Sequence, residues 1–318
     1  MNPVRVGVDL GGTKVLAGVV DGAGRVVRRS REDTRSEDVR SMVEGVRRVV
    51  ADVADDAPVS GIGVAVAGFV DITQSRVLVA PNLGLVDVPL RRMLEDAIGA
   101  PVTLENDSNA AGWGEFRYGA ARGRDECLVV TVGTGVGAGL ILDGRLRRGA
   151  TGVAGEVGHL PAERGGLLCG CGRHGCLEQY ASGSALVRNT RHLLDERGPE
   201  TVALLDRVDR DVATLTGSDV TDAAQDGDRF ARGQLAVIGS WLGEVLAGLI
   251  TVLDLDTVVV GGGVAEAGSL LLEPAERALN ASLVQRPGMT RVRVIPAELG
   301  TDAGIIGAAD LARSAVHQ

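Results

Sequence analysis

Two stretches of the chain repeat one pattern, in which an apolar strand, a glycine turn and a second apolar strand follow one another directly. The first stretch contains Asp9-Leu-Gly-Gly-Thr-Lys14, and the second contains Gly133-Thr-Gly-Val-Gly137. A glycine turn between two strands is a hairpin, which differs from the strand-to-helix turn of a dinucleotide-binding or P-loop site. One such hairpin in each half of the 318 residues predicts a duplicated α/β architecture whose glycine amides approach phosphate groups closely.

The first hairpin also carries two charged side chains suited to a metal–phosphate group. Asp9 could hold Mg2+ directly or through water, because Mg2+ prefers carboxylate and water oxygens. Lys14 is the only lysine in the chain, which favours a functional role. Arginine carries every other positive side-chain charge of this kind, so a bias toward arginine makes the single lysine stand out more. The alternative is an ordinary tight hairpin, since Asp-Gly-Gly segments are common in turns.

Three of the four cysteines lie close together between two glutamates, Glu156 and Glu178. They are Cys169, Cys171 and Cys176, with His159 upstream and glycines at 170, 172 and 175. Three thiolates and one imidazole suit a closed tetrahedral Zn2+ site, and the glycines allow a tight loop. The alternative is a disulfide with spare thiols, although Cys169 and Cys171 are too close in sequence to pair easily. His174 is a competing nitrogen ligand. A metal that fixed this loop would also fix the two glutamates as acceptors for the hydroxyls of a small polyol.

A polar cluster, Glu105-Asn-Asp-Ser-Asn109, follows the apolar strand predicted at 102–104. Asp or Ser at the start of the next helix is an ordinary N-cap, so capping alone could explain two of these residues. Five polar residues in succession exceed what a cap requires, and the ends of strands are where open α/β sheets place their chemistry.

Hydrophobic periodicity predicts the remaining elements. Helices are expected at 36–56, 90–98, 110–118, 184–197, 230–253, 269–279 and 302–309, strands at 62–66, 257–260 and 291–295, and loops at 67–71 and 81–84. Aromatic residues make up only 2% of the chain, so the core must consist of Val, Leu, Ala and Ile. The small residues of the last helix predict close packing against a neighbour.

Composition restricts the partners and the compartment. A net charge of −9 and a pI near 5.1 argue against nucleic acid or an anionic membrane as the main partner. No run approaches the length expected of a membrane span, and the first residues lack the basic and apolar pattern of a secretion signal. A cluster of free thiols fits a reducing cytoplasm.

Five motifs together resemble the ROK family of sugar kinases and repressors, which belongs to the actin-like ATPase superfamily. They are Asp9-Leu-Gly-Gly-Thr-Lys14, Glu105-Asn-Asp107, Gly133-Thr-Gly-Val-Gly137, Glu156-Val-Gly-His159 and Cys169-Gly-Cys-Gly-x-x-Gly-Cys176-Leu-Glu178. The match runs in order over essentially the whole chain, and the cysteine loop and the Glu-x-Gly-His motif are specific to that family.

The resemblance implies two ribonuclease-H-like α/β domains with a cleft between them. We expect residues 1–106 with 301–318 to form a small N-terminal domain, and residues 107–300 to form a larger one that carries the cysteine loop. Asp107 matches the catalytic base. The residues that match sugar contacts are Gly68, Asn106, Asp107, Glu156, His159 and Glu178. Those that match contacts to ATP and Mg2+ are Asp9, Gly11, Gly12, Thr13, Lys14, Gly133, Thr134, Gly135, Gly137, Gly261, Gly262 and Gly263. The zinc ligands would be His159, Cys169, Cys171 and Cys176, with one ring nitrogen of His159 on the metal and the other toward the sugar.

Within the family, the segments around Glu105 and Glu178 look most like those of bacterial glucokinases, with Ser108 standing where alanine is commoner. The implied activity is ATP-dependent phosphorylation of the 6-hydroxyl of D-glucose, in a cytoplasmic homodimer or homotetramer that serves glycolysis. The alternatives are kinases for N-acetylmannosamine, N-acetylglucosamine, allose or fructose, and a sugar-responsive repressor. Such repressors carry a helix-turn-helix ahead of the first glycine turn, and with that turn beginning at Asp9 we expect none.

Overall fold

The computed structural model describes residues 3–34, 38–195, 198–283 and 291–315. Contacts between residues divide the chain into two compact units. The first comprises Met1–Asp125, Gly139–Gly155 and Glu298–Gln318, and the second comprises Glu126–Ala138 and Glu156–Ala297. The first unit includes residues 1–106 and 301–318, which the sequence assigns to the small domain, together with further segments. The predicted domain boundary at residue 107 stays a prediction, because a division by contacts describes packing alone.

The first unit is built around a mixed sheet with helices on both faces. Its elements are β1 (Val4–Leu10), β2 (Lys14–Val20), β3 (Val26–Asp33), α1 (Val39–Ala54), β4 (Val59–Val66), β5 (Phe69–Val70), β6 (Val77–Ala80), β7 (Leu85–Val88), α2 (Leu90–Ile98), β8 (Val102–Asn106), α3 (Asp107–Tyr118), β11 (Arg145–Leu146) and α10 (Ala303–Ala315), with 3-10 turns at Pro81–Leu83 and Gly300–Asp302.

The second unit combines a largely parallel sheet with a group of helices. Its elements are β9 (Cys127–Val132), α4 (Glu178–Ala181), α5 (Gly183–Asp195), α6 (Val202–Arg207), α7 (Gly217–Gln225), α8 (Arg229–Leu253), β12 (Thr257–Gly261), α9 (Ser269–Ser282) and β13 (Arg293–Pro296), with 3-10 turns at Val157–His159, Pro199–Thr201, Val212–Thr214 and Gly263–Ala267. The division between the units falls within β10 (Val136–Leu142).

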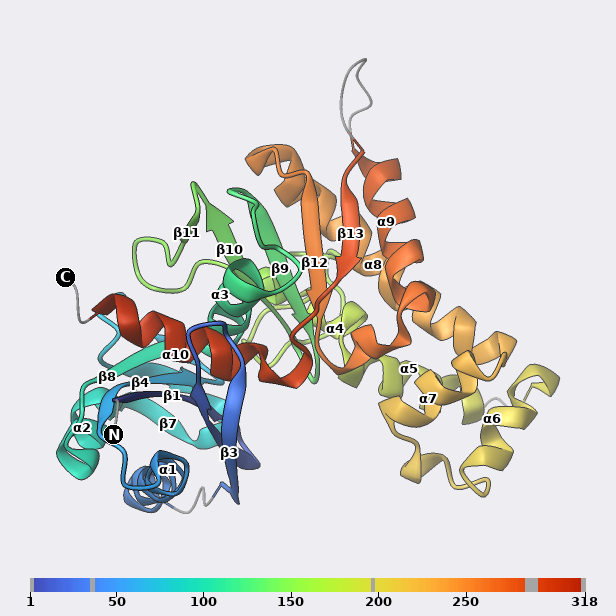
Figure 1. Ribbon diagram of the computed structural model, residues 1–318. Coiled ribbons are helices and arrows are strands. Elements are labelled where there is room, and N and C mark those ends of the chain that lie inside the picture. The colour runs from blue at the N-terminus through green and yellow to red at the C-terminus, as the bar shows by residue number, and fades with distance from the viewer. Residues whose placement is uncertain (1–2, 35–37, 196–197, 284–290, 316–318) are drawn as a thin grey trace. The chain divides into compact units, whose positions relative to one another are not determined.

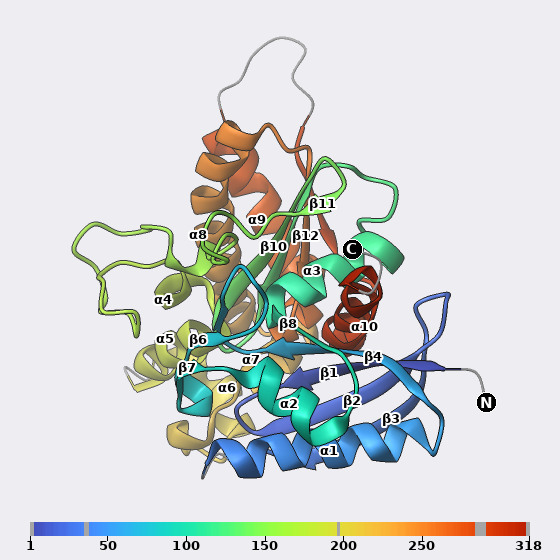
Figure 2. The same cartoon turned by 90° about the vertical axis from the view of Figure 1, so that its left-hand side faces the viewer.

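The main sheet of the first unit has the strand order β3-β2-β1-β4-β8, in which β1, β4 and β8 are parallel. Figure 2 shows it lying between α1 and α10. Side chains alternate along a strand, so Val6 and Val8 of β1 pack in the core with α1 while Gly7 faces α10. A Cβ on Gly7 would lie 1.9 Å from the carbonyl oxygen of Ile305, so glycine is needed for α10 to lie directly on the strand.

Helices α3 and α10 also approach closely through glycine. A Cβ on Gly307 would lie 1.8 Å from the carbonyl oxygen of Ala110, and one on Gly114 would lie 2.5 Å from that of Ala303. Buried Asp310 joins the same two helices by accepting a hydrogen bond from Trp113 Nε1 at 2.9 Å. The predicted close packing of the last helix is therefore confirmed.

In the second unit, β9, β12 and β13 run parallel, within a sheet of order β11-β10-β9-β12-β13. Cys127 at the start of β9 is fully buried as a small core side chain. Helices α8 and α9 lie side by side (Figure 1). Glycine again permits the contact, because a Cβ on Gly243 would lie 2.1 Å from the carbonyl oxygen of Ala275.

Helix α8 corrects one expectation from the sequence. With 25 residues and a window of mean hydropathy 1.8, it is long and apolar enough to cross a membrane by length and composition alone. Its buried residues, such as Leu235, Leu242 and Leu246, lie on the side that packs against α9 and other helices of the second unit. A core helix with one buried face meets the same criteria.

Most predicted elements are present, with shifts at their ends. Helix α2 has the predicted bounds, and the helix predicted at 36–56 is α1, which begins at Val39 because Asp38 caps it. Residue 36 lies outside the described residues, as do 196 and 197 at the end of the helix predicted over 184–197, here α5. The small sheet β5-β6-β7 was not predicted, and residues 67–71 and 81–84 are not simple loops. Strands of two to four residues are too short to show alternation.

Candidate functional site

The polar cluster at 105–109 spans the junction of β8 and α3. Strand β8 reaches Asn106, and α3 begins at Asp107, three residues earlier than predicted. Asn106 is the N-cap, because its Oδ1 accepts a hydrogen bond from the Asn109 backbone N–H at 2.9 Å. The capping explanation therefore applies to Asn106, and Asp107 occupies the first turn without that task.

The carboxylate of Asp107 has one oriented oxygen and one open oxygen. Oδ1 accepts hydrogen bonds from the Ser108 backbone N–H at 2.8 Å and from Asn106 Nδ2 at 3.0 Å. The Ser108 hydroxyl also donates to Oδ1, at 3.4 Å, and among the residues that the structure describes none of these three bonds reaches Oδ2. Removal from water raises the pKa of Asp107 above its usual value. An oriented carboxylate with one open oxygen can accept a proton from a substrate hydroxyl.

Gly68, which the sequence placed among the sugar contacts, lies beside this junction. Its carbonyl oxygen accepts a hydrogen bond from Asn106 Nδ2 at 3.1 Å. A Cβ on Gly68 would lie 2.6 Å from the carbonyl oxygen of Val79, so the close approach of these segments depends on glycine. Gly68, Asn106 and Asp107 are thus brought together within the first unit.

The first glycine turn closes as a hairpin in the same unit. The Gly11 N–H donates to the Lys14 carbonyl oxygen at 3.0 Å, and the Thr13 carbonyl oxygen accepts from the Thr34 N–H at 3.0 Å. A Cβ on Gly12 would lie 2.9 Å from the carbonyl oxygen of Asn82. Glycine at positions 11 and 12 therefore leaves the backbone of the turn without side chains there, which is the surface that a phosphate group needs.

Asp9, at the end of β1, has a perturbed acidity. The pKa of Asp9 is raised to about 6, mainly by burial and then by the negative charge of Asp107, while the positive charge of Lys14 opposes the change. A carboxylate whose charge is made costly by burial and by a neighbouring carboxylate is a suitable place for a divalent cation, which would relieve that cost. The chemistry of this pair therefore fits the predicted Mg2+ contact.

The second and third glycine turns lie together in the second unit. The Gly133 N–H donates to the Gly135 carbonyl oxygen at 3.0 Å, and the Ser184 hydroxyl donates to the Thr134 carbonyl oxygen at 2.7 Å. A Cβ on Gly262, which has φ +87°, would lie 2.5 Å from the carbonyl oxygen of Val132. The other predicted glycines flank these turns: Gly137 lies in β10, Gly261 ends β12 and Gly263 begins the following 3-10 turn.

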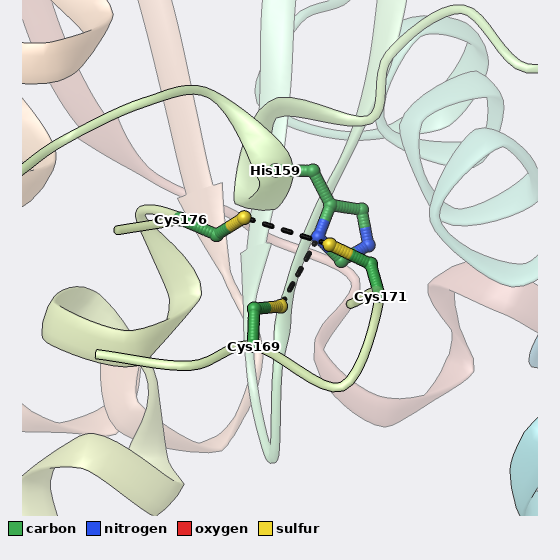
Figure 3. A group of neighbouring side chains, drawn as sticks. All are labelled: His159, Cys169, Cys171 and Cys176. Carbon is green, nitrogen blue, oxygen red and sulfur yellow. Dashed lines mark hydrogen bonds between the residues drawn. The ribbon is translucent and has the colours of Figure 1, made fainter. Parts of the chain in front are cut away.

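The four predicted zinc ligands form one cluster in the second unit (Figure 3). One donor atom from each of His159, Cys169, Cys171 and Cys176 lies within 4.8 Å of all the others. Cys169 Sγ is 3.6 Å from His159 Nδ1, and Cys171 Sγ is 3.6 Å from Cys176 Sγ. A tetrahedral ion with Zn–S bonds of about 2.3 Å requires sulfur–sulfur separations of about 3.8 Å, so this donor set fits zinc.

The fold of the cysteine loop excludes the two alternatives raised by the sequence. All four cysteines are free thiols, so the loop holds no disulfide. Nδ1 of His174 lies 2.9 Å from the Gly166 carbonyl oxygen, and His174 does not belong to the cluster. Two of the three glycines are needed for their conformation, since Gly172 has φ +85° and Gly175 has φ +78°.

His159 turns one ring nitrogen toward the sulfurs and the other away from them, as Figure 3 shows. Glu178 adjoins the cluster, because its Oε1 lies 2.9 Å from Cys169 Sγ and 3.7 Å from His159 Nδ1. Burial raises the pKa of the Cys169 thiol to about 12, and hydrogen bonds from Arg173 lower that of Cys171 to about 7. A bound cation would favour the thiolate at each position.

Glu156 stands at the start of the 3-10 turn that carries His159. Its carbonyl oxygen accepts a hydrogen bond from the His159 N–H at 3.1 Å. A Cβ on Gly158 would lie 2.1 Å from the Val136 carbonyl oxygen, so the turn packs tightly against β10. Glu156 and His159 are therefore held on one rigid turn.

A sequence profile of the ROK family matches residues 5–315. This chain belongs to the ROK family. The glucokinase of Streptomyces coelicolor is 38% identical to it over 308 residues, which cover 97% of each chain. The N-acetylmannosamine kinase of Yersinia pseudotuberculosis is 33% identical over 310 residues, covering 97% of this chain and 98% of that kinase. Among solved structures, the ROK family glucokinase from Streptomyces griseus in complex with glucose and AMPPNP has a TM-score of 0.90 and 40% identity, covering 98% of this chain and 99% of that chain.

Membership of the ROK family confirms the resemblance on which the sequence interpretation depended, and the α/β architecture is the actin-like ATPase fold of ROK kinases. One buried group beside Asp107 had no assigned role: Glu105 pairs with Arg148. Nothing in the sequence singles out Arg148, because it ends an arginine-rich stretch far from residue 105.

Proposed function

We propose that this chain is an ATP-dependent glucokinase, which transfers the γ-phosphoryl group of ATP to the 6-hydroxyl of D-glucose. The products are glucose 6-phosphate and ADP. The observation that carries the proposal is the carboxylate of Asp107, with Oδ1 oriented by two nitrogen donors and Oδ2 left open. The glucokinase relatives, one of them solved with glucose and AMPPNP, support the choice of sugar and nucleotide.

Asp107 is the general base of this reaction. Its Oδ2 accepts the hydroxyl proton as the sugar oxygen attacks the phosphoryl group, and hydrogen bonds at Oδ1 fix the direction of the carboxylate. The raised pKa of Asp107 strengthens the base, provided that the pH keeps it deprotonated. Direct in-line transfer needs no covalent intermediate on the protein.

The phosphate groups and Mg2+ belong to the substrate MgATP. Asp9 is proposed to hold the cation directly or through water, and Lys14 to pair with a phosphate. The glycine amides of the three turns contact the nucleotide without steric hindrance, since glycine has no side chain. The support is the raised pKa of Asp9 and the tight backbone packing of Gly12 and Gly262.

One structural Zn2+ is proposed for the four-residue cluster in the second unit. Four protein donors complete a tetrahedral shell, so the metal would hold the loop in shape and leave no open position for water. Metal on Nδ1 of His159 fixes the tautomer, which leaves Nε2 to contact a sugar hydroxyl. Glu156 and Glu178 are the other sugar contacts proposed for this unit, and Gly68 and Asn106 are those proposed for the first.

Kinases for other hexoses are the nearest alternative, which the similarity to an N-acetylmannosamine kinase supports. A coupled ADP assay over glucose, fructose, allose, N-acetylglucosamine and N-acetylmannosamine distinguishes them. Glucose should give the highest kcat/KM. A higher value for any other sugar would replace glucose as the substrate, and binding without turnover would favour a sugar-responsive binding protein.

We also propose a cytoplasmic homodimer or homotetramer in carbohydrate metabolism, without nucleic-acid or membrane partners. A cluster of free thiols supports a reducing compartment, and the net charge of −9 disfavours nucleic acid. The outward face of α8, with exposed Val237 and Val252 and half-buried Trp241, supports association between copies of the chain. Light scattering on the purified protein measures the mass directly.

A further inference from the structure

Glu105 is a buried carboxylate next to the proposed base, with only 3% of its side chain exposed. Its two oxygens accept four hydrogen bonds. Oε1 accepts from the Asn106 backbone N–H at 3.0 Å and from Asn109 Nδ2 at 3.1 Å. Oε2 accepts from Gln74 Nε2 at 3.2 Å and from Arg148 Nε at 2.6 Å. All four partners are donors, so only a charged carboxylate satisfies all of them.

These four bonds join three segments of the first unit that are distant in sequence. Asn106 and Asn109 belong to the β8–α3 junction, and Gln74 belongs to the turn between β5 and β6. The backbone of Gln74 has a left-handed conformation, with φ +57°. Its side chain also donates a hydrogen bond to the Leu104 carbonyl oxygen at 3.0 Å, so both parts of the residue are fixed in position. Arg148 belongs to the strap, which we define as residues 147–155.

The strap is anchored at its far end as well. The Arg148 carbonyl oxygen accepts a hydrogen bond from the Ala154 N–H at 3.0 Å, which closes the strap into a loop. Gly152, with φ +97°, lies against β5, since a Cβ there would be 2.4 Å from the Val70 carbonyl oxygen. The ion pair with Glu105 therefore fixes the strap to the end of β8 through a side chain.

We propose that Glu105 and Arg148 are a positioning pair for phosphoryl transfer, which holds the junction and the strap in the geometry that the sugar requires. The inference rests on the proposed function. Glu105 orients the Asn106 backbone, and Asn106 in turn donates to Asp107 Oδ1 and to the Gly68 carbonyl oxygen. Glu156 follows the strap directly in the chain. The role assigned to the pair is positioning, which it exerts through Asn106 and the strap.

The proposal is tested with Glu105→Gln, Arg148→Gln and the double variant. An amide at position 105 places an NH2 group against two donors and removes the ion pair, and Arg148→Gln leaves a buried carboxylate without its counter-charge. Loss of hydrogen bonds to a charged group predicts a rise of about 10-fold or more in the glucose KM, with the ATP KM within about twofold. The glucose KM of the double variant should lie within about twofold of the higher of the two single-variant values, because the two residues act through one bond. Arg148→Lys, which keeps the charge, should restore part of the loss.

Asp310→Asn is the matched control, since Asp310 is a buried carboxylate that binds side chains of α3 and lies near Arg117 at 3.5 Å. It should lower thermal stability without changing the ratio of the two KM values. Hydrogen exchange on the ligand-free protein provides a measurement that needs no substrate. Glu105→Gln should speed exchange at residues 71–76 and in the strap, with little change in α10.

The two measurements separate the inference from the proposed function. Wild-type enzyme inactive on glucose but active on another hexose would refute the proposed substrate, and the KM ratio is then measured with that hexose. Wild-type enzyme inactive on every sugar would overturn both. Equal changes in both KM values, additive losses in the double variant, or unchanged exchange in the strap would each overturn the positioning pair.

Discussion

Replacing Asp107 with asparagine removes the proposed proton acceptor while keeping the shape of the side chain. The three groups that bind Oδ1, which are the Ser108 N–H, the Ser108 hydroxyl and Asn106 Nδ2, can all donate, and in the described part of the chain none of them reaches Oδ2. The introduced amide can therefore keep its oxygen at the Oδ1 position and turn its NH2 group toward the open side. The start of α3 stays intact, and an acceptor becomes a donor where the sugar hydroxyl must lose its proton.

The expected loss follows from general acid–base catalysis. Removing a positioned base lowers kcat by about 10²–10⁴, which corresponds to about 3–5 kcal/mol in the activation barrier. The assay is coupled ADP release at saturating glucose and MgATP, with calorimetry of glucose binding beside it. Glucose affinity should change only a few-fold, because Asn106 and Gly68 remain in place.

The stability of Asp107→Asn should change in the opposite direction to its activity. Burial raises the pKa of Asp107, and an acid whose folded pKa is raised contributes stability that is present below its unfolded pKa of about 3.9 and is lost as the pH rises through the folded pKa. At pH 7 the wild type carries the cost of a buried charge, and the neutral amide does not. The Tm of the variant at pH 7 should equal or exceed that of the wild type, and the difference should shrink as the pH approaches 4.

A helix cap provides the control for this prediction. Asp38 caps α1 by accepting hydrogen bonds from the backbone N–H groups of Arg40 and Ser41. Asp38→Ala should lower the Tm, because two backbone N–H groups of the first turn lose their acceptor, and should leave kcat unchanged. If Asp107→Asn behaved like Asp38→Ala, with near-normal turnover and a lower Tm, Asp107 would be a structural residue at the start of α3.

Three further predictions follow from the same structure. Asp9→Ala should impair MgATP-dependent turnover more than glucose binding, and calorimetry that showed lost glucose affinity with intact nucleotide binding would contradict this. In the wild type, where the pKa of Asp9 is about 6, MgATP affinity should fall as the pH drops through that value. Elemental analysis should find one Zn2+ per chain, and Cys171→Ala should raise the glucose KM and lower the Tm while changing ATP affinity much less; active enzyme without zinc would refute the metal assignment. Gly63→Ala should destabilise the first unit by about 1–3 kcal/mol, because the new Cβ would lie 1.8 Å from the Ala308 carbonyl oxygen, whereas Gly22→Ala, with nothing within 4 Å, should leave the Tm unchanged.

The parts of the fold that could be predicted from the sequence are those with strong local patterns. Helix α8 and strand β12 appear within one residue of their predicted bounds, because long apolar faces and buried runs fix their type. The sheet β5-β6-β7 escaped prediction because its short strands are stabilised by pairing with one another. The start of α3 was placed too late, since a polar first turn looks like a loop.

The candidate site divides in the same way. The cysteine cluster could be predicted because its donors lie within one short loop, whose chemistry is local. The bond between Glu105 and Arg148 could not, because it joins residues 43 positions apart through the packing of the first unit. Which ring nitrogen of His159 faces the sulfurs is likewise a property of the folded turn.

The buried carboxylates of the first unit themselves distinguish structural from chemical roles. Glu105 accepts hydrogen bonds at both oxygens from four donors, Glu115 accepts at both from the backbone of residues 120, 298 and 299, and Asp310 accepts at both from Tyr118 and Trp113. In each of these carboxylates both oxygens are bound by groups of the chain itself, so the charge serves to hold the chain. Asp107 lies in the same unit with one oxygen bound and the other open to a substrate. An unbound oxygen on a desolvated carboxylate carries a cost in stability. That Asp107 has such an oxygen, while Glu105, Glu115 and Asp310 in the same unit do not, is the strongest structural argument for the proposal that Asp107 performs the chemistry.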